Sequence, residues 1–512
     1  MPGVDPDIPT YTNPILDADW PDPDVVRLGD QFVLVASSFN RAPGLPVLTS
    51  PDLVRWTHAG NALPANVPAE HFALPRHGGG VWAPSIRERG GRLVIVYPDP
   101  DHGIYTLWAD RPEGPWSQPH LLLQGQGLID PCPLWDDDGR AYLVFGWANS
   151  RAGIKNRLTM IEVDESLTCP LGAGRLVIDA DDLSGYTTLE GPKLYKRDGW
   201  YWIFAPAGGV ATGWQSVFRS RSIWGPYEDR IVLAQGSTDV NGPHQGAWIT
   251  DAAGDDWFVH FQDRGMYGRV AHLQPMAWGE DGWPTMGTPG ADGVGEPVRT
   301  HRRPATARPD PDAAADPIPP SPVADDFTAD SLTPAWHWQG NPEPGWHQTG
   351  DGRLGLAHLP NDRGDLRDLP QVLGQLLPGW PVTVEVSLTL DSKSQGARAG
   401  LTVLGLRYSW VGVQRTATGL ELVAALGDDR QRETEVSRLP VASSAVALRL
   451  SSPADGTVHY DWRADGGDWQ PLLDAKVTEG HWIGAEIGLF AAAPEGTAAD
   501  EWSWITRFAV TP

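Results

Sequence analysis

Cysteine is nearly absent from this chain: Cys132 and Cys169 are the only two in 512 residues. Two cysteines are too few for a disulfide framework, and neither stands in metal-ligand spacing, so we expect two plain thiols. No stretch is long and apolar enough to span a bilayer, and the first residues lack the basic and apolar segments of a signal peptide. We therefore expect a soluble, cytoplasmic protein, while a secreted protein whose signal peptide had been removed would show the same sequence.

Basic residues are also scarce, because 39 Lys and Arg stand against 65 Asp and Glu, a formal net charge of −26. An acidic excess of this size disfavours nucleic acid, anionic membranes and acidic polymers as partners. A neutral ligand remains compatible with the charge. Nothing in the composition indicates an oligomeric state.

Helical periodicity is scarce as well, and a different repeat takes its place. Five times between residues 12 and 298, a glycine turn precedes a short aromatic and β-branched run, at spacings of roughly 50 to 60 residues. The five runs begin at Gly29, Gly91, Gly139, Gly199 and Gly254. This period predicts a five-bladed β-propeller over residues 12–300, with the inner strands around a central cavity. A large β-sandwich is the competing architecture.

The composition changes after this region, where seven prolines interrupt Ala and Asp between residues 302 and 322. Residues 301–323 therefore read as a semi-rigid linker. Residues 324–512 read as a second all-β domain, because segments such as Val382–Leu390 alternate strictly between apolar and polar side chains. Aromatic residues near both of its ends, including Phe327 and Phe508, suggest that its first and last strands lie together in one sandwich.

Three acidic residues stand in short turns ahead of predicted blade strands, in the segments Pro21-Asp22-Pro23, Ile129-Asp130-Pro131 and Leu189-Glu190-Gly191-Pro192. Taken singly, an Asp-Pro is usually a turn residue and a loop Glu is usually on the surface. Acids that enter successive blades would instead converge on the propeller axis. Like charges gathered away from water cannot all ionise, so one acid should hold a proton at neutral pH. Glycoside hydrolysis requires such a set.

Several short motifs, in this order along the chain, resemble family 43 glycoside hydrolases, which are five-bladed propeller β-xylosidases and α-L-arabinofuranosidases. They are Asn13–Leu16, Pro21–Asp24, Val81–Ser85, Asp130-Pro131, Glu190–Pro192 and His244–Gly246. The resemblance covers about residues 12–298. The C-terminal part looks like the concanavalin-like jelly roll that follows the propeller in many β-xylosidases of that family, through Asp326-Phe327 and Trp336–Pro342.

The resemblance implies a role for each acid. Asp22 would be the general base that activates water, Glu190 the general acid that protonates the leaving oxygen, and Asp130 the group that keeps Glu190 protonated and oriented. Family members invert the anomeric centre, which fits an acid and a base about 6.5 to 9.5 Å apart. The implied reaction releases xylose or arabinose from neutral oligosaccharides of hemicelluloses such as xylan.

The resemblance also implies binding residues. Trp82 after three glycines would form a sugar-stacking wall, and Phe39 and Trp147 are further aromatic candidates, with core packing as the alternative for each; the chain has 25 tryptophans, most of them expected in the core. Arg269 would reach sugar hydroxyls and carboxylates, with a solvated arginine as the alternative. His244 would lie near the axis, where some members hold calcium through water molecules, so no cofactor is required and a structural calcium ion is optional.

The chain departs from the family pattern in two places. Gly208-Gly209-Val210 stands where related β-xylosidases often carry a threonine, and Phe490–Gly496 lacks the aromatic loop tip that closes the aglycone side in relatives. A more open pocket is therefore expected. A non-catalytic sugar-binding propeller is the alternative function. It would need aromatic platforms but no acid triad, so the three acids argue against it. A retaining fructosidase is disfavoured because neither its Asn-Asp-Pro-Asn type of turn nor its Glu-Cys motif is present.

Overall fold

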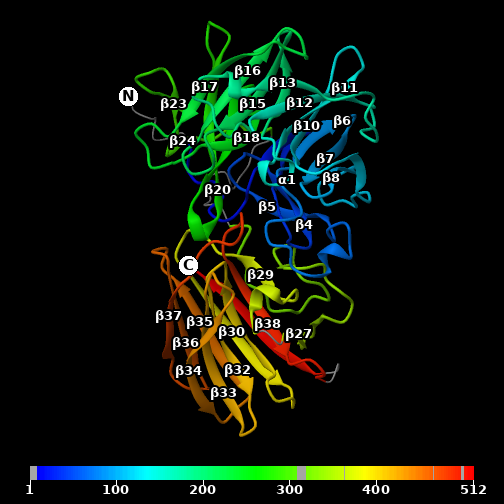
Figure 1. Ribbon diagram of the computed structural model, residues 1–512. Helices are drawn as coiled ribbons and strands as arrows, with labels where there is room; N and C mark the ends of the chain where they lie inside the picture. The colour runs from blue at the N-terminus through cyan, green and yellow to red at the C-terminus, as the bar shows by residue number, and fades with distance from the viewer. Residues whose placement is uncertain (1–8, 308–318, 362–363, 465, 498–500) are drawn as a thin grey trace.

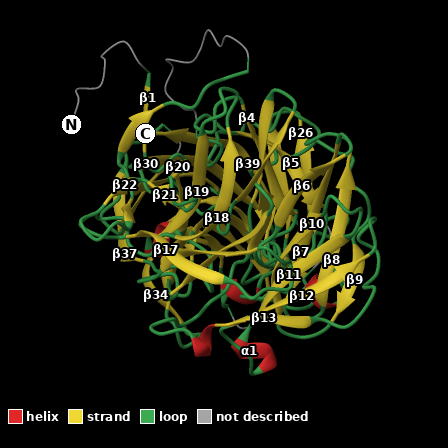
Figure 2. Ribbon diagram, turned by 90° about the horizontal axis from the view of Figure 1, so that it is seen from above, coloured by secondary structure: helices red, strands yellow, loops and turns green. Residues whose placement is uncertain are grey.

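The computed structural model describes residues 9–307, 319–361, 364–464, 466–497 and 501–512, and in it two β-structures lie end to end (Figure 1). The first contains five sheets arranged around a common axis, each built on an antiparallel meander of four strands and one of them extended by two short strands (Figure 2). The first strands of the first four sheets contact one another in sequence, and the first strand of the fifth sheet contacts both the fourth sheet and the first strand of the first, which closes the ring. The predicted five-bladed propeller is therefore confirmed, and the single large sandwich is excluded.

Each blade is an up-and-down meander of strands in sequence order. Blades 1 and 2 are β2 (Asp24–Leu28), β3 (Gln31–Val35), β4 (Gly44–Ser50) and β5 (Thr57–Leu63), then β6 (Ser85–Arg89), β7 (Arg92–Asp99), β8 (Gly103–Ala109) and β9 (His120–Gln124). Blades 3 and 4 are β10 (Leu128–Trp135), β11 (Ala141–Trp147), β12 (Arg157–Val163) and β13 (Arg175–Asp179), then β14 (Lys193–Arg197), β15 (Trp200–Ala207), β16 (Trp214–Ser220) and β17 (Glu228–Ala234). Blade 5 is β18 (His244–Thr250), β19 (Asp256–Asp263), β20 (Arg269–Trp278) and β21 (Pro284–Met286).

The repeated glycine turn is the hairpin between the first and second strand of each blade. All five glycines have positive φ, between 59° and 92°, a conformation that a side chain would strain. The aromatic and β-branched runs that follow them are β3, β7, β11, β15 and β19, whose buried side chains fill the space between blades. The sequence period therefore reflects one hairpin per blade.

Short strands complete the propeller at its edges. β1 (Thr10–Thr12) pairs with β24 (Thr300–Arg302), while β23 (Gly295–Glu296) and β22 (Thr288–Pro289) extend blade 4. In the part of the chain that the structure describes, helix is confined to α1 (Asn149–Ala152) and four 3-10 turns, η1 (His71–Ala73), η2 (Ala180–Asp182), η3 (Gly265–Tyr267) and η4 (Leu366–Asp368). Within the described residues, no helix has the length and apolar composition needed to cross a membrane. Cys132 is buried, Cys169 is exposed, and both are free.

The second structure is a sandwich of two antiparallel sheets. One has the order β25 (His337–Trp338), β29 (Leu373–Leu376), β38 (Glu486–Ala493), β31 (Arg398–Leu404), β32 (Tyr408–Arg415), β33 (Leu420–Gly427) and β34 (Glu433–Val441), with β28 (Leu359–Pro360) beside β38. The other has the order β26 (His347–Gly350), β27 (Arg353–Ala357), β39 (Trp502–Thr511), β30 (Val382–Asp391), β35 (Ala445–Ser452), β36 (Thr457–Arg463) and β37 (Gln470–Lys476).

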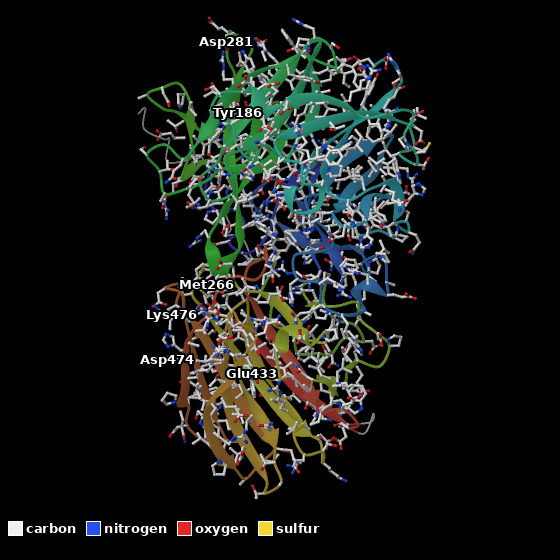
Figure 3. All side chains as sticks on the ribbon, viewed as in Figure 1. Tyr186, Met266, Asp281, Glu433, Asp474 and Lys476 are labelled. Carbon is white, nitrogen blue, oxygen red and sulfur yellow. The ribbon has the colours of Figure 1, made fainter. Side chains whose placement is uncertain are left out.

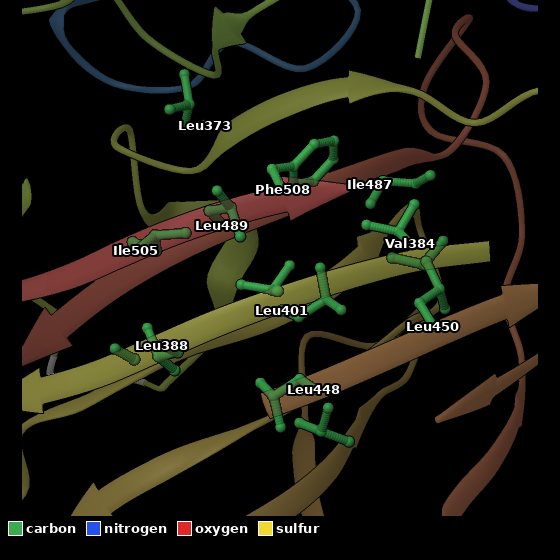
Figure 4. Close-up of a cluster of buried hydrophobic side chains, with 14 of the residues drawn as sticks. Leu373, Val384, Leu388, Leu401, Leu448, Leu450, Ile487, Leu489, Ile505 and Phe508 are labelled. Carbon is green, nitrogen blue, oxygen red and sulfur yellow. The ribbon is translucent and has the colours of Figure 1, made fainter. Parts of the chain in front are cut away.

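The apolar side chains of these strands meet between the two sheets, as the close-up of Leu388, Leu401, Leu448 and their neighbours shows (Figure 4). β30 alternates regularly between buried and half-buried positions, as its sequence predicts. The start of the domain pairs with its end, because the backbone of Asp325 bonds to that of Phe508. Of the predicted linker, residues 308–318 lie outside the described residues.

The two domains are in direct contact. Ala42 and Trp338 exchange backbone hydrogen bonds of 3.0 and 2.7 Å across the junction. The side chain of Asn341 bonds to the backbone of Asn66 through both its oxygen, at 2.7 Å, and its nitrogen, at 2.8 Å. These bonds place the sandwich against blade 1, close to the predicted site.

Candidate active site

A cavity of about 380 Å³ opens at one end of the propeller hub, where the inner strands begin. Seven of the eight predicted site residues line it, namely Asp22, Phe39, Trp82, Asp130, Trp147, Glu190 and Arg269. The eighth, His244, lies behind Glu190. The acids come from blades 1, 3 and 4, so the expectation of successive blades was wrong, because blade 2 places Trp82 at the corresponding position.

Strained backbone conformations orient three of these side chains. Asp22, Phe39 and Asp130 have φ of 54°, 51° and 55°, in the left-handed region that side chains other than glycine rarely adopt. Such a conformation costs roughly 1 kcal/mol or more per residue and tends to occur at functional sites. Asp22 precedes the first strand of its blade, whereas Asp130 lies inside β10 at a register shift between Ile129 and Cys132. The shift turns this carboxyl toward the axis instead of into the blade.

Asp22 is 4% exposed and ionically paired. Arg269 Nη1 lies 3.0 and 3.2 Å from its two carboxylate oxygens, and the Ser37 hydroxyl donates a 2.5 Å hydrogen bond to Oδ2. Arg269 is itself only 8% exposed, which excludes the alternative of a solvated surface arginine. Both partners stabilise an ionised Asp22, which is the form a general base needs.

Asp130 and Glu190 lie side by side across Gly146, where an added Cβ would be 3.7 Å from Asp130 Oδ2 and 3.9 Å from Glu190 Cα. Asp130 accepts a 2.7 Å hydrogen bond from the N–H of Gly191, the residue after Glu190. Burial and the neighbouring Glu190 carboxyl raise the pKa of Asp130 to about 8, against the opposing effect of this N–H. Glu190 is the more accessible acid, with 27% of its side chain exposed.

Beneath the cavity, the hub holds a second layer of charge that sequence reasoning missed. Lys193, fully buried, donates to Pro84 O at 2.7 Å and to the Ser85 hydroxyl at 2.8 Å, and its Nζ lies 3.6 Å from Asp24 Oδ2. Arg87 Nη1 donates to the same Asp24 oxygen at 2.7 Å. Lys193 follows Glu190-Gly191-Pro192 as the first residue of β14, and this position in the sequence could have identified it as a residue of the site.

Formal charges of these two layers balance only if one acid is protonated. The layers contain four carboxyl groups, on Asp22, Asp24, Asp130 and Glu190, and three permanent cations, on Arg87, Lys193 and Arg269. A buried set with one unmatched negative charge takes up a proton. The raised pKa of Asp130 identifies it, beside Glu190, as the member of the triad that takes up the predicted proton.

Aromatic residues form the walls of the cavity. Trp82 donates its indole N–H to Gly78 O at 3.1 Å, and its ring centroid lies 6.1 Å from that of Phe39. Trp147 is held by a 2.9 Å hydrogen bond from its indole nitrogen to the hydroxyl of Thr159. Arg151 of α1 lies over the Trp82 ring, 5.4 Å from its centroid. The indole bonds fix both tryptophans with a ring surface toward the cavity.

The sandwich domain contributes an aromatic wall too, from a different segment than the one compared with the family pattern. Segment 490–496 has no aromatic tip, as noted, but Trp482 in the preceding loop lines the same cavity. Its ring is 6.4 Å from that of Trp82 and 5.8 Å from the guanidinium carbon of Arg269. It is 47% exposed and has a φ of 68°. An exposed indole held in a strained conformation above a cavity signals a contact surface.

His244 is fully buried, and its Nε2 lies 3.0 Å from Glu190 Oε1. This contact orients the acid and gives the histidine a role without a metal. Among the described residues, no group of three or more His, Cys, Asp or Glu side chains has the geometry of a metal site. Direct calcium binding at His244 does not fit these contacts, since calcium takes six to eight oxygen ligands, and a calcium ion held through water molecules stays a prediction.

A propeller whose hub gathers an ionised carboxylate, a protonated acid pair and aromatic walls in one cavity has the architecture of a glycoside hydrolase. Comparison with known proteins defines the group. The model of glycosyl hydrolases family 43 matches residues 11–284, and that of the beta xylosidase C-terminal concanavalin A-like domain matches residues 324–511. The chain belongs to glycosyl hydrolases family 43.

Two relatives illustrate the match. A putative beta-xylosidase of Xylanibacter ruminicola is 35% identical over 494 residues, which cover 94% of this chain and 86% of that protein. A non-reducing end alpha-L-arabinofuranosidase of Bacteroides ovatus is 26% identical, with 94% and 91% covered. Among solved structures, a xylan beta-1,4-xylosidase from Bacillus halodurans superposes with a TM-score of 0.85 at 24% identity, covering 98% of this chain and 100% of the other, which supports the fold.

Proposed function

We propose that the protein is an inverting exo-glycosidase that releases xylose or arabinose from the ends of neutral xylo- and arabino-oligosaccharides. The contact that supports this most directly is the pairing of Asp22 with Arg269 and Ser37 beside the protonated Asp130 and Glu190 pair. One ionised and one protonated acid, on different blades, are what an inverting hydrolase needs. The names of these two relatives, a putative beta-xylosidase and an alpha-L-arabinofuranosidase, support the same two sugars.

In this mechanism Asp22 takes a proton from a water molecule, which attacks the anomeric carbon. Glu190 donates its proton to the leaving oxygen on the opposite side. Asp130 holds the turn after Glu190 through the N–H of Gly191, and its own charge would form only as the proton leaves the pair. His244 fixes the other side of the Glu190 carboxyl. Each protein group therefore either moves a proton or orients a group that does.

The size of the cavity supports action at a chain end. At about 380 Å³ it lies at the small end of the range for ligand sites, which run from about 300 to 1,000 Å³. Trp82 and Trp482, from different domains, line the cavity with their rings in edge-to-face contact, and such aromatic walls suit packing against apolar faces of sugar rings. The net charge of −26 favours neutral over acidic oligosaccharides.

A substrate panel tests this function. The wild-type protein should hydrolyse 4-nitrophenyl β-D-xylopyranoside or the α-L-arabinofuranoside, and NMR should show a first product of inverted anomeric configuration. Glu190→Gln should lose xylobiose hydrolysis by about 100-fold or more and lose less on the nitrophenyl substrate, whose leaving group needs little protonation. Glu113→Gln, in an exposed loop of blade 2, is the matched control. A retained configuration, or wild-type turnover of xylobiose by Glu190→Gln, would overturn the assignment.

A further inference from the structure

A buried chain of charges connects the sandwich domain to the catalytic pocket. Glu486, the first residue of β38, is 3% exposed, and its Oε1 accepts a 2.5 Å hydrogen bond from Nε of Arg41 in blade 1. His337 Nε2 lies 3.1 Å from the same oxygen. Arg41 is 5% exposed, and its Nη2 donates to Asp19 Oδ2 at 2.8 Å. A glutamate of one domain is thus joined through one arginine to an aspartate of the other.

Asp19 carries this connection to the arm that holds the base. Its second oxygen, Oδ1, accepts a 2.9 Å hydrogen bond from the backbone N–H of Arg269. Arg269 in turn holds both oxygens of Asp22 with its guanidinium. Asp19 packs tightly against the backbone before Arg269, because a Cβ on Gly268 would lie 2.1 Å from Asp19 Oδ1. The backbone from which Arg269 reaches Asp22 is therefore set by the position of Asp19.

The backbone of the sandwich presses on the same place. Ala485 donates its N–H to Met266 O at 2.7 Å, and a Cβ on Gly484 would lie 2.8 Å from the backbone nitrogen of Gly268. Met266 stands at the junction of the two domains (Figure 3). Residues 484–486 thus hold the segment before Arg269 by main-chain contact and by charge.

Stability alone is a weak explanation for such a chain. Desolvation of buried ion pairs offsets much of their attraction, so apolar residues of similar volume would often serve the junction as well. Charged hydrogen bonds between planar groups, in contrast, fix distance and direction. Supporting groups of this kind, one step removed from the reacting residues, hold catalytic side chains in productive geometry.

We propose that Glu486, Arg41 and Asp19 are positioning residues, through which the sandwich domain sets the orientation of Arg269 and hence of the base Asp22. The proposal rests on the proposed function, because it assigns Asp22 the part of general base. It makes the sandwich a structural part of the catalytic apparatus on the base side of the sugar, separate from the wall that Trp482 provides. The effect of breaking the chain should therefore fall on kcat, whereas the loss of a wall should fall on KM.

The experiment compares Glu486→Ala with Glu433→Ala in the full chain. Glu433 is the matched control, since it is a half-buried sandwich glutamate paired with Arg398 at 2.7 Å and lies away from the propeller (Figure 3). Glu486→Ala should lower kcat by about 10- to 100-fold, with a small change in KM, and move the acidic limb of the pH profile of kcat/KM upward by about one pH unit. Glu433→Ala should leave kcat and the limb unchanged.

A double-mutant cycle tests whether the residues act as one chain. In Asp19→Asn the side-chain oxygen can still face Arg269, but its amide nitrogen faces Arg41, donor against donor. This variant should reproduce the limb shift, and Glu486→Ala combined with it should cost no more than the larger single loss. If Glu486→Ala does not fold, Glu486→Gln replaces it in the cycle, with a smaller loss expected.

Three results would count against the proposal. A wild-type kcat and acidic limb in a folded Glu486 variant would overturn it, as would fully additive losses in the cycle. A rise in KM alone would mean that the sandwich acts only through its wall. Failure of the wild-type protein to hydrolyse either nitrophenyl pentoside would instead refute the proposed function, and the positioning role with it.

Discussion

Asp130 should make the protein less stable as the pH rises, and Asp130→Asn should remove that effect. The pKa of Asp130 is raised from 3.8 to about 8 in the folded protein. The folded state therefore binds this proton more tightly than the unfolded chain does between about pH 4 and pH 8, so the unfolding free energy falls as the pH rises through that window. At about 1.4 kcal/mol per pKa unit, a difference of about four units corresponds to about 6 kcal/mol above pH 8.

Asparagine is uncharged at every pH, and its side-chain oxygen can still accept the N–H of Gly191. Calorimetry should therefore show Asp130→Asn unfolding near the wild-type temperature at pH 4.5 and roughly 10 °C above it at pH 8.5, while its activity is reduced. Asp110→Asn, at a side chain that is 83% exposed, is the control and should follow the wild type. Parallel pH profiles of wild type and Asp130→Asn would refute the reasoning, because they would mean that this carboxyl ionises as freely when folded as when unfolded.

Further predictions concern the base, the wall and the junction. Ser37→Ala removes the 2.5 Å hydrogen bond to Asp22, and steady-state kinetics should show kcat/KM lowered about tenfold, a loss of about 1.5 kcal/mol; unchanged kinetics would contradict this role. Trp482→Ala should raise KM about 5- to 10-fold with kcat nearly retained, Trp482→Phe should recover most of it, and an unaltered KM would exclude stacking. Burial opposes ionisation of Glu486, but His337 and Arg41 outweigh burial and lower the pKa of Glu486 to about 2. About 3 kcal/mol of stability is therefore present above pH 4.5 and is lost as the pH falls toward 2. Calorimetry between pH 2 and 5 should show this acid-sensitive component in the wild type and not in Glu486→Gln.

Local sequence patterns predicted much of the fold, because each is the direct expression of a backbone requirement. A hairpin between the first two strands of a blade needs a residue with positive φ, and glycine at positions 29, 91, 139, 199 and 254 meets that need. The buried second strand needs a run of aromatic and β-branched residues, which therefore recurs at the same spacing. The period of these two features is sufficient to count the blades.

The identities of the candidate acids could also be found in the sequence. Asp22, Asp130 and Glu190 stand beside prolines or glycines at the start of blades, where a polar side chain has no structural use as a core residue. Each of the three acids stands where a blade begins, and every blade begins at the same end of the hub. The sequence therefore places all three acids at that end. Their charge states could not be predicted individually, because the pKa of Asp130 depends on burial and on a carboxyl 60 residues away.

What the sequence by itself determined is the number of blades, the second all-β domain and the acids at the hub. Only the tertiary structure decided that Arg269 and Ser37 hold Asp22, that a proton belongs to the Asp130 and Glu190 pair, and that Trp482 closes a cavity in the other domain. The reason is physical: strand periods and turn residues are set by bonds between near neighbours, whereas these contacts join segments up to several hundred residues apart. They exist only once the ring of blades has closed and the sandwich has packed against it.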